Sequence, residues 1–482
     1  MQDFFETFRD RLRDGGIARL RAGLIGRDTQ FDGPFGPVRL LYADWVASGR
    51  ALAQVEDAVR EHVLPFYANS HTEASHCGMV MTRLREAARA VALAHVGGGD
   101  DCHAIFTGSG ATAGLARLVS LLDLPARVRA GARVVVIHGP YEHHSNLLPW
   151  RESGAEVVEI AEAPGGGVDM AALDASLDAA QGAETIVGAF SACSNVTGIL
   201  TDVDAVTRRL KARGALAVWD YAGGGPYLPI RMAPAPGAEI DAVALSPHKF
   251  PGGPGASGLL VVRNTVVRAA RPSVPGGGTV SFVSPWAHDY SSRVEAREEG
   301  GTPNVVGDIR AALALCVKEA AGIDAIDARD AALRARALAE LSDVPGLELL
   351  GREAVAPALP ILSFRLRDGA GRPVHHQLVT RLLSDLHGVQ ARGGCACAGP
   401  YAHRLLGIDE AASEALRTRL ARGEELDKPG WTRLNLSWLH CDEEVARILA
   451  AVRDVAGRID TLAGLYAADR ATARFAPLAA AG

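Results

Sequence analysis

Short apolar runs alternate with helix-like segments between about residues 100 and 265. Each run is rich in β-branched or small apolar residues and ends in a polar or Gly-rich turn, which is typical of a buried strand. The predicted strands are Ala104–Phe106, Val134–Ile137, Thr185–Phe190, Ala215–Trp219, Asp241–Leu245 and Gly258–Val262. Helical patterns lie between them, for example at Thr112–Leu122 and Val203–Ala212. Such alternation predicts an α/β fold, with a mostly parallel sheet flanked by helices in a large domain over residues 60–305.

The pattern changes after residue 305 to long helices rich in Ala, Leu and Arg, at Asp308–Ala320 and Ala325–Leu341. Strand candidates follow at Leu347–Leu350, Ile361–Arg367, Gly388–Ala391 and Thr432–Ser437. We therefore expect a smaller α+β domain over residues 306–466, which residues 1–59 join. Residues 467–482 are rich in Ala and show little periodicity, which predicts a flexible tail.

The N-terminal segment predicts an amphipathic helix docked on the body of the protein. Its apolar residues recur at helical spacing, at Phe4, Phe5, Phe8 and Leu12. The segment lacks the apolar core of a signal peptide, and its acidic residues argue against a mitochondrial presequence. No apolar run in the chain reaches the roughly 20 residues that span a bilayer.

The composition is that of a folded protein with a mild acidic balance. Of the 482 residues, 48% are hydrophobic and 22% are charged, which excludes wholesale disorder. The net charge of −6 argues against nucleic acid or an anionic membrane as a partner. The seven cysteines are scattered and odd in number, so they form no disulfide framework. We therefore expect a reducing, cytoplasmic location.

Lysine is rare in this chain, and one lysine stands out. Arginine supplies 46 of the 50 basic residues, and the lysines are Lys211, Lys249, Lys318 and Lys428. Lys249 lies just past a predicted strand, in a turn rich in Gly and Pro, where a solubilising charge is a poor explanation. The other three lie among charged or polar neighbours in helix-like segments or a loop. A desolvated lysine can act as an amine nucleophile and form a Schiff base with an aldehyde, which makes Lys249 the candidate.

Polar residues follow the other predicted strands. The turn TGSGATAG, at residues 107–114, opens a helix whose first N–H groups favour a phosphate, with the Thr112 hydroxyl beside them. The same spacing also resembles a dinucleotide fingerprint, and such turns often only cap a helix. Asp220 ends the strand ALAVW and is placed either to cap a helix or to pair with a protonated ring nitrogen.

Two further residues extend this set. His143 follows Val134–Ile137, where it would stack on a planar ring and relay protons, although a lone His is more often structural. Asn195 follows Thr185–Phe190 and would donate to a ring hydroxyl. The carboxyl ends of parallel strands meet at one edge of the sheet, which is where ligands bind. Together, these features describe a site for a phosphorylated aromatic aldehyde, pyridoxal phosphate.

The motifs resemble the class V aminotransferases of pyridoxal-phosphate fold type I, especially the cysteine desulfurase and selenocysteine lyase branch. The resemblance runs from about Tyr42 to Val445, and its most specific motif is SPHKFPGGPG, followed by EHHSNLLPW. It implies that Lys249 holds the cofactor and that His143 stacks on it. It also implies cofactor contacts at Ala111, Thr112, Asn195, Asp220, Ser246 and His248. EEGGTPN resembles the segment whose Thr reaches the phosphate of the neighbouring subunit, so Thr302 implies a homodimer.

Two motifs concern the substrate. ARGGCACAGP resembles the desulfurase loop, which puts the sulfur-accepting cysteine at Cys397 and a loop arginine at Arg392. TRLNLSWLHCDEEV resembles the segment whose Arg holds the substrate α-carboxylate, hence Arg433, and a guanidinium fork suits that task. The resemblance implies that L-cysteine is converted to L-alanine, with a persulfide on Cys397. A thiolate is needed for that step, so we expect the positive charge of Arg392 to lower the Cys397 pKa.

The chain departs from the desulfurase pattern at several positions. Gly223 stands where a Gln is usual, Cys395 stands where His is common, and Arg50 adds a further candidate contact for a carboxylate. The segment between Cys397 and Arg433 is longer than usual, with a charged helix-like insert around Glu410–Glu425. These departures leave the cofactor assignment intact and weaken the substrate assignment. An aminotransferase, epimerase or lyase acting on another amino acid is therefore the alternative.

Other interpretations remain open from the residues alone. Cys397 is also explained as a small buried hydrophobe, or as a metal ligand with Cys395 and His403, although no second ligand pair stands out and we expect no metal. A Cys395–Cys397 disulfide is disfavoured because residues two apart rarely meet its geometry. A nicotinamide-dependent dehydrogenase is disfavoured because no acidic residue ends Val134–Ile137. A binding protein with a relic site is hard to reconcile with Lys249, Asp220 and His143.

The expected partners are a small amino-acid substrate, a second copy of the chain and a protein that accepts the sulfur.

Overall fold

A computed structural model describes residues 2–70 and 72–478, which divide into two compact units. The first unit comprises the described parts of Met1–Ile25, Ser48–Cys193 and Thr201–Ala325. The second comprises Gly26–Ala47, Ser194–Leu200 and the described part of Ile326–Gly482. The chain therefore passes between the two units several times.

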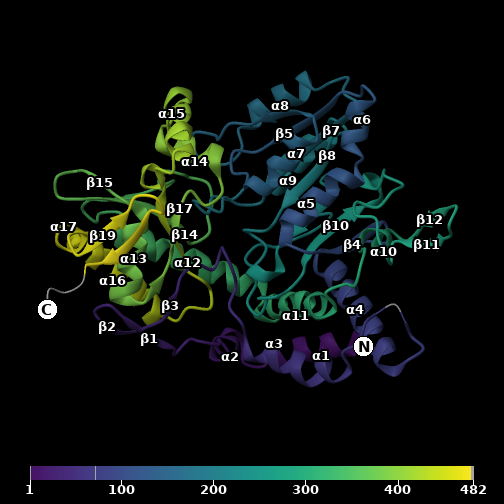
Figure 1. Ribbon diagram of the computed structural model, residues 1–482, viewed down its shortest axis with the longest axis horizontal. Coiled ribbons are helices and arrows are strands. Elements are labelled where there is room, and N and C mark those ends of the chain that lie inside the picture. Colours follow the sequence, from purple (N-terminus) through teal and green to yellow (C-terminus); the bar gives the residue numbers. More distant parts are fainter. Residues whose placement is uncertain (1, 71, 479–482) are drawn as a thin grey trace. The chain divides into compact units, whose positions relative to one another are not determined.

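A seven-stranded sheet forms the centre of the first unit, in the order β4-β10-β9-β8-β7-β5-β6 (Figure 1). Its strands are β4 (Cys102–Thr107), β5 (Val134–His138), β6 (Glu156–Glu159), β7 (Thr185–Ser191), β8 (Leu216–Asp220), β9 (Ala242–Leu245) and β10 (Gly258–Arg263). Only β10 is antiparallel to its neighbours; the other neighbouring strands run parallel. The predicted mostly parallel α/β sheet is confirmed, as are all six predicted strands.

β6 was not predicted from the sequence. Its sequence, EVVE, is short, and it pairs only with β5 at the edge of the sheet. An edge strand needs no continuous apolar run, because one of its sides and part of its faces meet water. The continuous apolar run that identified the central strands is therefore absent from β6.

Helices cover both faces of this sheet. The helices of the first unit are α1 (Gln2–Arg13), α2 (Gly16–Ala22), α3 (Ala53–Ala58), α4 (His76–His95), α5 (Gly110–Leu121), α6 (Leu124–Arg129), α7 (Leu148–Glu152), α8 (Met170–Ala179), α9 (Val203–Ala212), α10 (Val294–Glu298) and α11 (Val305–Ala321). Side chains of α5, α6 and α7 share one buried cluster with alternate residues of the strands. α9 packs on the opposite face, where Leu210 lies so close to Gly188 that an added Cβ would meet its methyl groups at 2.4 Å. Gly188 thus lets α9 approach the sheet closely.

The predicted N-terminal amphipathic helix is confirmed as α1, which packs on α11 and α4. Phe5, Phe8 and Leu12 are buried, and Arg9 donates to Glu319 of α11 at 3.1 Å. α1, α3 and α11 therefore belong to the sheet unit. The predicted boundaries put residues 1–59 and 306–466 in the small domain. The division in the structure differs because the apolar face of α1 packs on α11, so both helices belong to the unit of the large sheet.

The second unit is built on an antiparallel sheet in the order β13-β14-β18-β17, with β15 also paired to β14. Its sheet strands are β13 (Leu347–Leu349), β14 (Ile361–Arg367), β15 (Pro373–Val374), β17 (Arg392–Gly394) and β18 (Trp431–Asn435), and β16 (Val389–Gln390) pairs with β3 (Leu41–Tyr42). Its helices are α13 (His376–His387), α14 (Gly399–Leu406), α15 (Glu410–Ala421), α16 (Asp442–Gly457), α17 (Ile459–Ala463) and most of α12 (Ile323–Leu341). The predicted α+β character and the predicted insert helix are confirmed.

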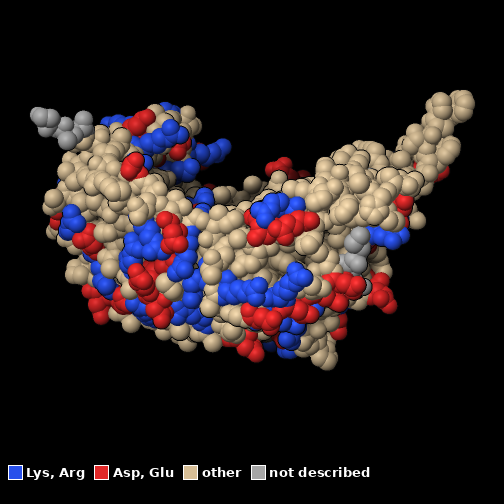
Figure 2. Space-filling model, turned by 90° about the horizontal axis from the view of Figure 1, so that it is seen from below, with Lys and Arg blue, Asp and Glu red and all other residues tan. Residues whose placement is uncertain are grey.

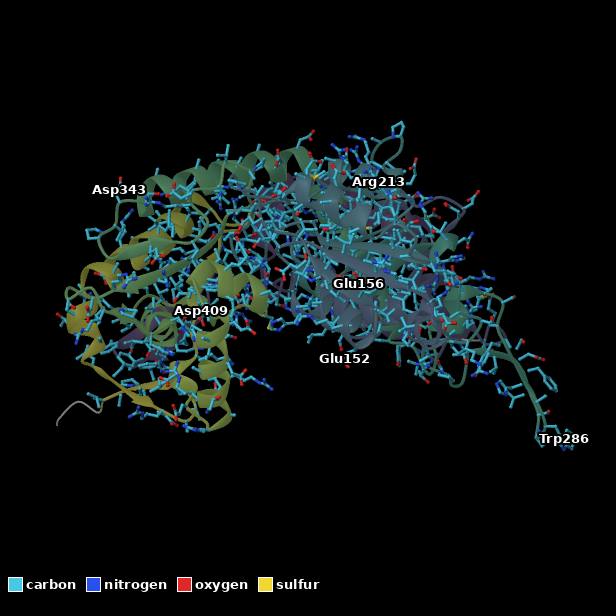
Figure 3. The ribbon with its side chains drawn as sticks, turned by 90° about the horizontal axis from the view of Figure 1, so that it is seen from above. Glu152, Glu156, Arg213, Trp286, Asp343 and Asp409 are labelled. Carbon is cyan, nitrogen blue, oxygen red and sulfur yellow. The ribbon has the colours of Figure 1, made fainter. Side chains whose placement is uncertain are left out.

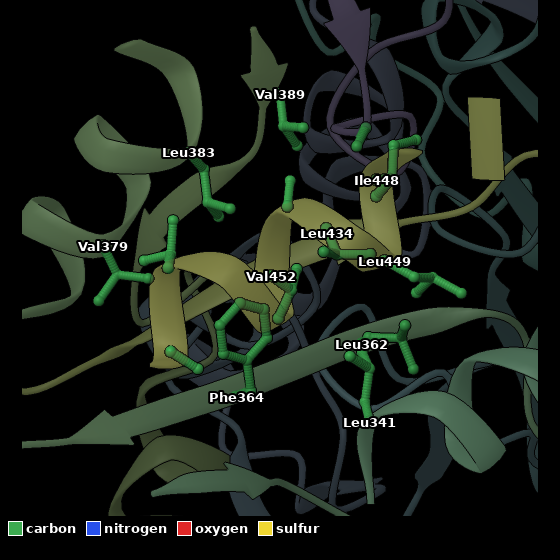
Figure 4. Packing of buried hydrophobic residues seen from close by; sticks show 14 of the residues in the cluster. Leu341, Leu362, Phe364, Val379, Leu383, Val389, Leu434, Ile448, Leu449 and Val452 are labelled. Atoms are coloured by element: carbon green, nitrogen blue, oxygen red, sulfur yellow. The ribbon is translucent and has the colours of Figure 1, made fainter. Parts of the chain in front are cut away.

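One hydrophobic cluster holds the second unit together (Figure 4). Leu362 and Phe364 of β14 and Leu434 of β18 point into it from the sheet, and Ile448 and Val452 of α16 meet them from the helical side. These side chains alternate along each strand with residues that face the other way, including Ser363 and Arg433. The alternation places Arg433 on the face away from this core.

The end of the chain forms a hairpin where the sequence predicts a flexible tail over residues 467–482. β19 (Tyr466–Asp469) pairs with β20 (Arg474–Pro477). Phe475 packs against the core of the second unit, with its ring 5.3 Å from that of His375. The last four residues of the predicted tail lie outside the described residues. Two smaller hairpins complete the fold, β1 (Gln30–Gly33) with β2 (Gly36–Arg39) and β11 (Val280–Val283) with β12 (His288–Tyr290).

The surface shows no segregation of charge on the face drawn in Figure 2, where basic and acidic side chains are interspersed. This distribution agrees with the small net charge of −6. Within residues 2–70 and 72–478, no helix combines the length and apolar character needed to cross a membrane.

Candidate active site

The candidate cofactor residues gather at one edge of the sheet in the first unit. β5, β8 and β9 are parallel, and β4 runs in the same direction because β10 is antiparallel to both β4 and β9. Their carboxyl ends therefore lie at the same edge, as predicted. The residues that follow these ends are Ala111 and Thr112 after β4, His143 after β5, Asp220 at the end of β8, and Ser246, His248 and Lys249 after β9.

The turn before α5 is shaped by Gly110, whose φ is +59°. An added Cβ at Gly110 would lie 2.7 Å from Ser246 Oγ and 2.8 Å from His248 Cε1. The backbone N–H of Ala111 donates to Ser246 Oγ at 3.0 Å. The first turn of α5 is therefore lined by a hydroxyl and an imidazole as well as by its own N–H groups, an arrangement that suits a phosphate.

A chain of hydroxyl contacts joins this turn to the histidine loop. Thr112 Oγ1 lies 2.6 Å from Ser145 Oγ, which lies 2.9 Å from His143 Nδ1. His143 Nδ1 also accepts the backbone N–H of Ser145 at 3.1 Å. Because Nδ1 accepts this bond, the neutral ring carries its proton on Nε2. The orientation and the tautomer of His143 are both set by its own loop.

Asp220 and His248 have shifted pKa values at this edge. Asp220 is buried, and burial raises its pKa, although the N–H of Ala222, bonded at 2.7 Å, and the charge of Lys249 oppose that shift. Burial also lowers the pKa of His248 to about 4, with a further contribution from Lys249. Asp220 is thus a carboxylate placed where a cation would stabilise its charged form, and His248 is neutral at pH 7.

Glu142, which was not predicted from the sequence, is buried directly before His143. Its Oε1 accepts the N–H of Ser191 at 2.9 Å, and its Oε2 accepts from Asn146 Nδ2 at 2.5 Å and from Ser191 Oγ at 2.6 Å. Burial raises the Glu142 pKa to about 7 despite these bonds, and the Asp220 charge adds to the rise. Glu142 therefore ties the histidine loop to the end of β7.

The environment of Lys318 also differs from the prediction, in which Lys318 was an ordinary charged residue on the surface of a helix. It lies on α11 but is only 4% exposed, and its Nζ donates to the carbonyl oxygens of Gly225 at 2.7 Å and Leu228 at 2.5 Å. Its Nζ lies 5.7 Å from the ring centre of Phe250, the residue after Lys249. Burial lowers the Lys318 pKa to about 7. The charged neighbours along the sequence did not reveal that this side chain points into the core.

These residues fit pyridoxal phosphate on two structural observations. The Gly110 turn leaves room that a Cβ would fill, beside the Ser246 hydroxyl and the start of α5. Asp220 is a buried carboxylate whose pKa is raised by burial, so a cationic ring nitrogen beside it would relieve an unfavourable buried charge. The donors suit the phosphate, and the carboxylate suits the ring.

The second unit holds the candidate carboxylate-binding residue, Arg433 on β18. Its NH2 donates to Asp44 Oδ1 at 3.1 Å and its NH1 to the carbonyl oxygen of Asn195 at 3.0 Å. Arg433 Nε is buried and has no hydrogen-bond partner among the described residues. Burial lowers the Arg433 pKa, and Asp44 opposes that shift. A carboxylate ligand would satisfy the orphan N–H.

Asp44 also binds Arg392 of β17, with Nε at 2.9 Å and NH2 at 2.8 Å from Oδ2. Burial lowers the Arg392 pKa, but the bond and charge of Asp44 outweigh burial and raise it overall, with smaller contributions from Tyr42 and Cys397. Asp44 thus binds both Arg392 and Arg433, the two arginines predicted from the sequence. Asp44 was not predicted from the sequence, because it is separated from both arginines by more than 300 residues.

The Cys397 loop has an unusual backbone. Ala396 and Cys397 have φ values of +53° and +54°, in the left-handed region that L-residues seldom adopt. Asn195 Nδ2 donates to the Ala396 carbonyl at 2.8 Å and holds the loop, while Asn195 Oδ1 has no partner among the described residues. The Cys397 side chain is exposed, so the interpretation of Cys397 as a buried hydrophobe is wrong.

The remaining predicted residues lie as follows. Both ring nitrogens of His403 are engaged, with Gly399 O at 2.8 Å and Ser413 Oγ at 2.9 Å, so this ring is not turned toward the cysteines as a ligand. Among the described residues, no group of three or more His, Cys, Asp or Glu side chains is placed to hold a metal ion. Thr302 is exposed in the turn before α11. Arg50 NH2 donates to the Ile25 carbonyl at 2.9 Å, and its contact with a substrate stays a prediction.

The fold and the residues at the sheet edge define a pyridoxal-phosphate enzyme of fold type I. Residues 41–423 match the model of the family described as Aminotransferase class-V. The chain is 30% identical over 365 residues to a cysteine desulfurase of Enterobacter sp. strain 638, covering 75% of this chain and 85% of that protein. It is 28% identical over 372 residues to a probable cysteine desulfurase of Streptomyces coelicolor, covering 76% and 85%.

A solved structure shows the same fold. The apo structure of a cysteine desulfurase from Thermococcus onnurineus NA1 matches with a TM-score of 0.71 at 23% identity, over 87% of this chain and 95% of that one. The chain belongs to the class V aminotransferase family. Members of this family use pyridoxal phosphate, so the protein is a pyridoxal-phosphate-dependent enzyme and the predicted cofactor is confirmed.

Proposed function

We propose that the protein is a cysteine desulfurase that converts L-cysteine to L-alanine and takes the sulfur onto Cys397. The observation that carries this proposal is the exposed Cys397 thiol, held in a left-handed loop by Asn195 in the unit that also carries Arg392 and Arg433. The names of the similar proteins support it, because the relatives described above are cysteine desulfurases or probable ones.

The first unit would hold the cofactor. Lys249 would bind its aldehyde, and the turn at Ala111 and Thr112, with Ser246 and His248, would bind its phosphate. Asp220 would pair with the ring nitrogen and His143 would stack on the ring. Bound pyridoxal phosphate supplies an electron sink for the substrate Cα. Asn195, which belongs to the second unit, would donate to the ring oxygen with the second hydrogen of its amide nitrogen, because the first is used by Ala396.

Arg433 would hold the substrate carboxylate. Its buried Nε has no partner among the described residues, and Asp44 and the Asn195 carbonyl fix the other edge of its guanidinium. Orienting the carboxylate in this way would fix the Cα–H bond relative to the groups that move its proton, Lys249 or His143. Arg50 would give a further contact for a carboxylate.

Cys397 would act as the sulfur acceptor. Its thiolate would attack the sulfur of L-cysteine, so that a sulfur–sulfur bond forms as the carbon–sulfur bond breaks. A proton would then be delivered to the substrate carbon, and alanine would leave. The exposure of Cys397 would let an acceptor protein take the sulfur from the resulting persulfide.

The test is the release of alanine from L-cysteine, measured with the persulfide on the protein. We expect Cys397→Ala to abolish persulfide formation and to lower sulfide release by at least about 100-fold, as expected for loss of a nucleophile. Cys441→Ala, which removes a cysteine of the second unit at the start of α16, is the matched control and should retain activity. Unchanged alanine release by the Cys397 variant would contradict the sulfur step.

The second candidate is an aminotransferase, epimerase or lyase acting on another amino acid. Gly223 favours it, because this position after Asp220 has no side chain to bond the ring oxygen as the usual Gln would. The same cofactor residues and Arg433 would serve either reaction. A screen of amino acids by cofactor absorbance separates the two candidates, because only a desulfurase should respond to L-cysteine with both alanine and sulfide.

The protein would act as a homodimer in the cytoplasm. Thr302, which would reach the phosphate of the neighbouring subunit, lies in an exposed turn, and the N–H of the adjacent Gly301 bonds Gly277 O at 2.7 Å, at the base of the β11–β12 hairpin. That hairpin exposes Phe282, Val283 and Trp286, an apolar surface that suits an interface. An exposed catalytic thiol needs a reducing compartment.

A further inference from the structure

The second unit contains a cavity of about 380 Å³ at the place where β18 begins. β14 pairs with β18 up to Phe364 and with β15 from Leu366 onward, so the sheet has a gap beside Arg365. The cavity lies at this gap. Its apolar wall includes Phe364, Leu366, Val379, Leu406, Ile408 and Leu426. This volume lies in the range of small-molecule sites, about 300–1,000 Å³.

Two buried N–H donors of the lining side chains have no partner among the described residues. Trp431 is fully buried, and its indole Nε1 makes no hydrogen bond. His375 Nε2 is likewise buried and unbonded. A buried donor without a partner destabilises the folded protein by about 1–3 kcal/mol. A ligand with a hydrogen-bond acceptor would therefore stabilise two such donors around one cavity.

The geometry around His375 shows that its Nε2 is the donor. Its Nδ1 accepts the N–H of Gln377 at 3.2 Å, at the start of α13, so the neutral ring carries its proton on Nε2. The ring stacks on His376 at 4.3 Å, and Phe475 lies on it at 5.3 Å. Burial lowers the pKa of His375, which favours this neutral form. His375 therefore presents a fixed N–H rather than an acceptor.

One cation of the lining, Lys428, has only a long ion pair among the described residues. Arg365 is bonded to Glu348, with NH2 at 2.7 Å from Oε2, and Asp427 accepts from Arg419 at 3.1 Å. Lys428 also lines the cavity, and its ion pair with Glu425 is long, at 3.9 Å. Its position helps to lower the pKa of His376, after the larger effect of burial and that of His375. Among the described residues, the polar groups of the lining without a close partner therefore include two N–H donors and an ammonium.

We propose that this cavity binds a small carboxylate with an apolar body. The carboxylate would accept from Trp431 Nε1, His375 Nε2 and Lys428 Nζ, and the body would lie against the aliphatic and aromatic wall. Donors on three residues that line one largely apolar cavity match that chemistry, since a carboxylate only accepts. The site is separate from the proposed reaction and does not depend on it.

Leu426, Asp427 and Lys428 of the lining follow directly after the charged insert around Glu410–Glu425.

Calorimetric titration of the holoenzyme with 4-phenylbutyrate, and in parallel with hexanoate, tests the proposal. We expect saturable binding of one carboxylate per chain, with 4-phenylbutanol, which lacks the charge, binding at least about tenfold more weakly. Trp431→Phe keeps the ring and removes the donor, and Lys428→Met removes the charge at a half-exposed position. Each should weaken binding by about tenfold or more.

Trp438→Phe is the matched control, because Trp438 Nε1 is also buried and unbonded but does not line the cavity. Its affinity for 4-phenylbutyrate should equal that of the unaltered protein. No saturable binding of either carboxylate would overturn the proposal, as would binding that Lys428→Met leaves unchanged. The Lys428 variant keeps the test decisive if Trp431→Phe fails to fold.

Discussion

At the scale of single residues, buried carboxyl groups near the candidate site link protonation to stability. Glu142 has a pKa of about 7 in the folded protein, above its ordinary value of 4.5, because burial disfavours its charge. The folded state therefore holds a proton between pH 4.5 and 7 that the unfolded chain has lost. The contribution of Glu142 is fully present below pH 4.5 and is lost as the pH rises through 7.

Glu142→Gln should remove this pH dependence, because Gln does not titrate. We expect the free energy of unfolding of the unaltered protein, relative to that of the variant, to fall by about 3 kcal/mol from pH 4.5 to pH 8. The measurement is the midpoint of urea unfolding across this range. Glu152→Gln, at an exposed position on α7, is the control and should leave the profile unchanged. Parallel profiles for the Glu142 variant and the unaltered protein would contradict the assignment.

The sequence predicted residues whose role depends on their place along the chain and missed residues whose role depends on distant partners. Lys249, Asp220 and His143 stand directly after apolar strands, so their placement at one sheet edge follows from the order of the elements. Lys318 shows no such signal, because its partners are carbonyls of residues 225 and 228, about 90 positions away. Asp44 was likewise hidden, since Arg392 and Arg433 become its neighbours only when the second unit folds.

At the scale of elements, α5 and the turn before it form the candidate phosphate site. The turn needs Gly at position 110 for two reasons, its φ of +59° and the nearness of Ser246 Oγ. Only the second reason concerns the ligand, so the two effects can be separated by a control glycine.

Gly110→Ala should weaken cofactor binding by about tenfold or more, because its Cβ would push Ser246 and His248 away from the start of α5. The measurement is titration of the apo protein with pyridoxal phosphate, followed by absorbance. Gly97→Ala is the control: its φ is +61°, but an added Cβ meets nothing within 4 Å. Both variants should lose some stability from backbone strain, and equal losses of cofactor affinity would contradict the phosphate role.

The burial of each element decides how well the sequence predicts it. The central strands are buried on both faces, so they appear as apolar runs whose ends agree with the structure to within a few residues. The edge strand β6 and the β19–β20 hairpin lack such runs. They are stabilised by pairing with one neighbour, and by packing of single residues such as Phe475, which local patterns do not encode.

At the scale of the whole molecule, the β11–β12 hairpin of the first unit predicts association. Trp286 lies at its tip, as Figure 3 shows, and is 90% exposed. An exposed Trp with apolar neighbours is typical of an interface with another chain.

Trp286→Ser should therefore weaken the proposed homodimer by about tenfold or more, since large aromatic side chains dominate interface energies. Sedimentation velocity over a range of protein concentrations measures the effect. Val355→Ser is the control, because Val355 is 88% exposed on a loop of the second unit. A protein that is monomeric at all concentrations before any substitution would contradict the dimer.

Borohydride reduction of the holoenzyme, followed by mass analysis of its peptides, identifies the residue that binds the cofactor aldehyde, which we propose is Lys249. We expect a yellow protein and one pyridoxyl adduct, on Lys249, with none on Lys211, Lys318 or Lys428. Lys249→Ala should lose both the visible absorbance and the adduct. An adduct on Lys318, the buried lysine of α11, or a colourless protein at saturating pyridoxal phosphate, would contradict it.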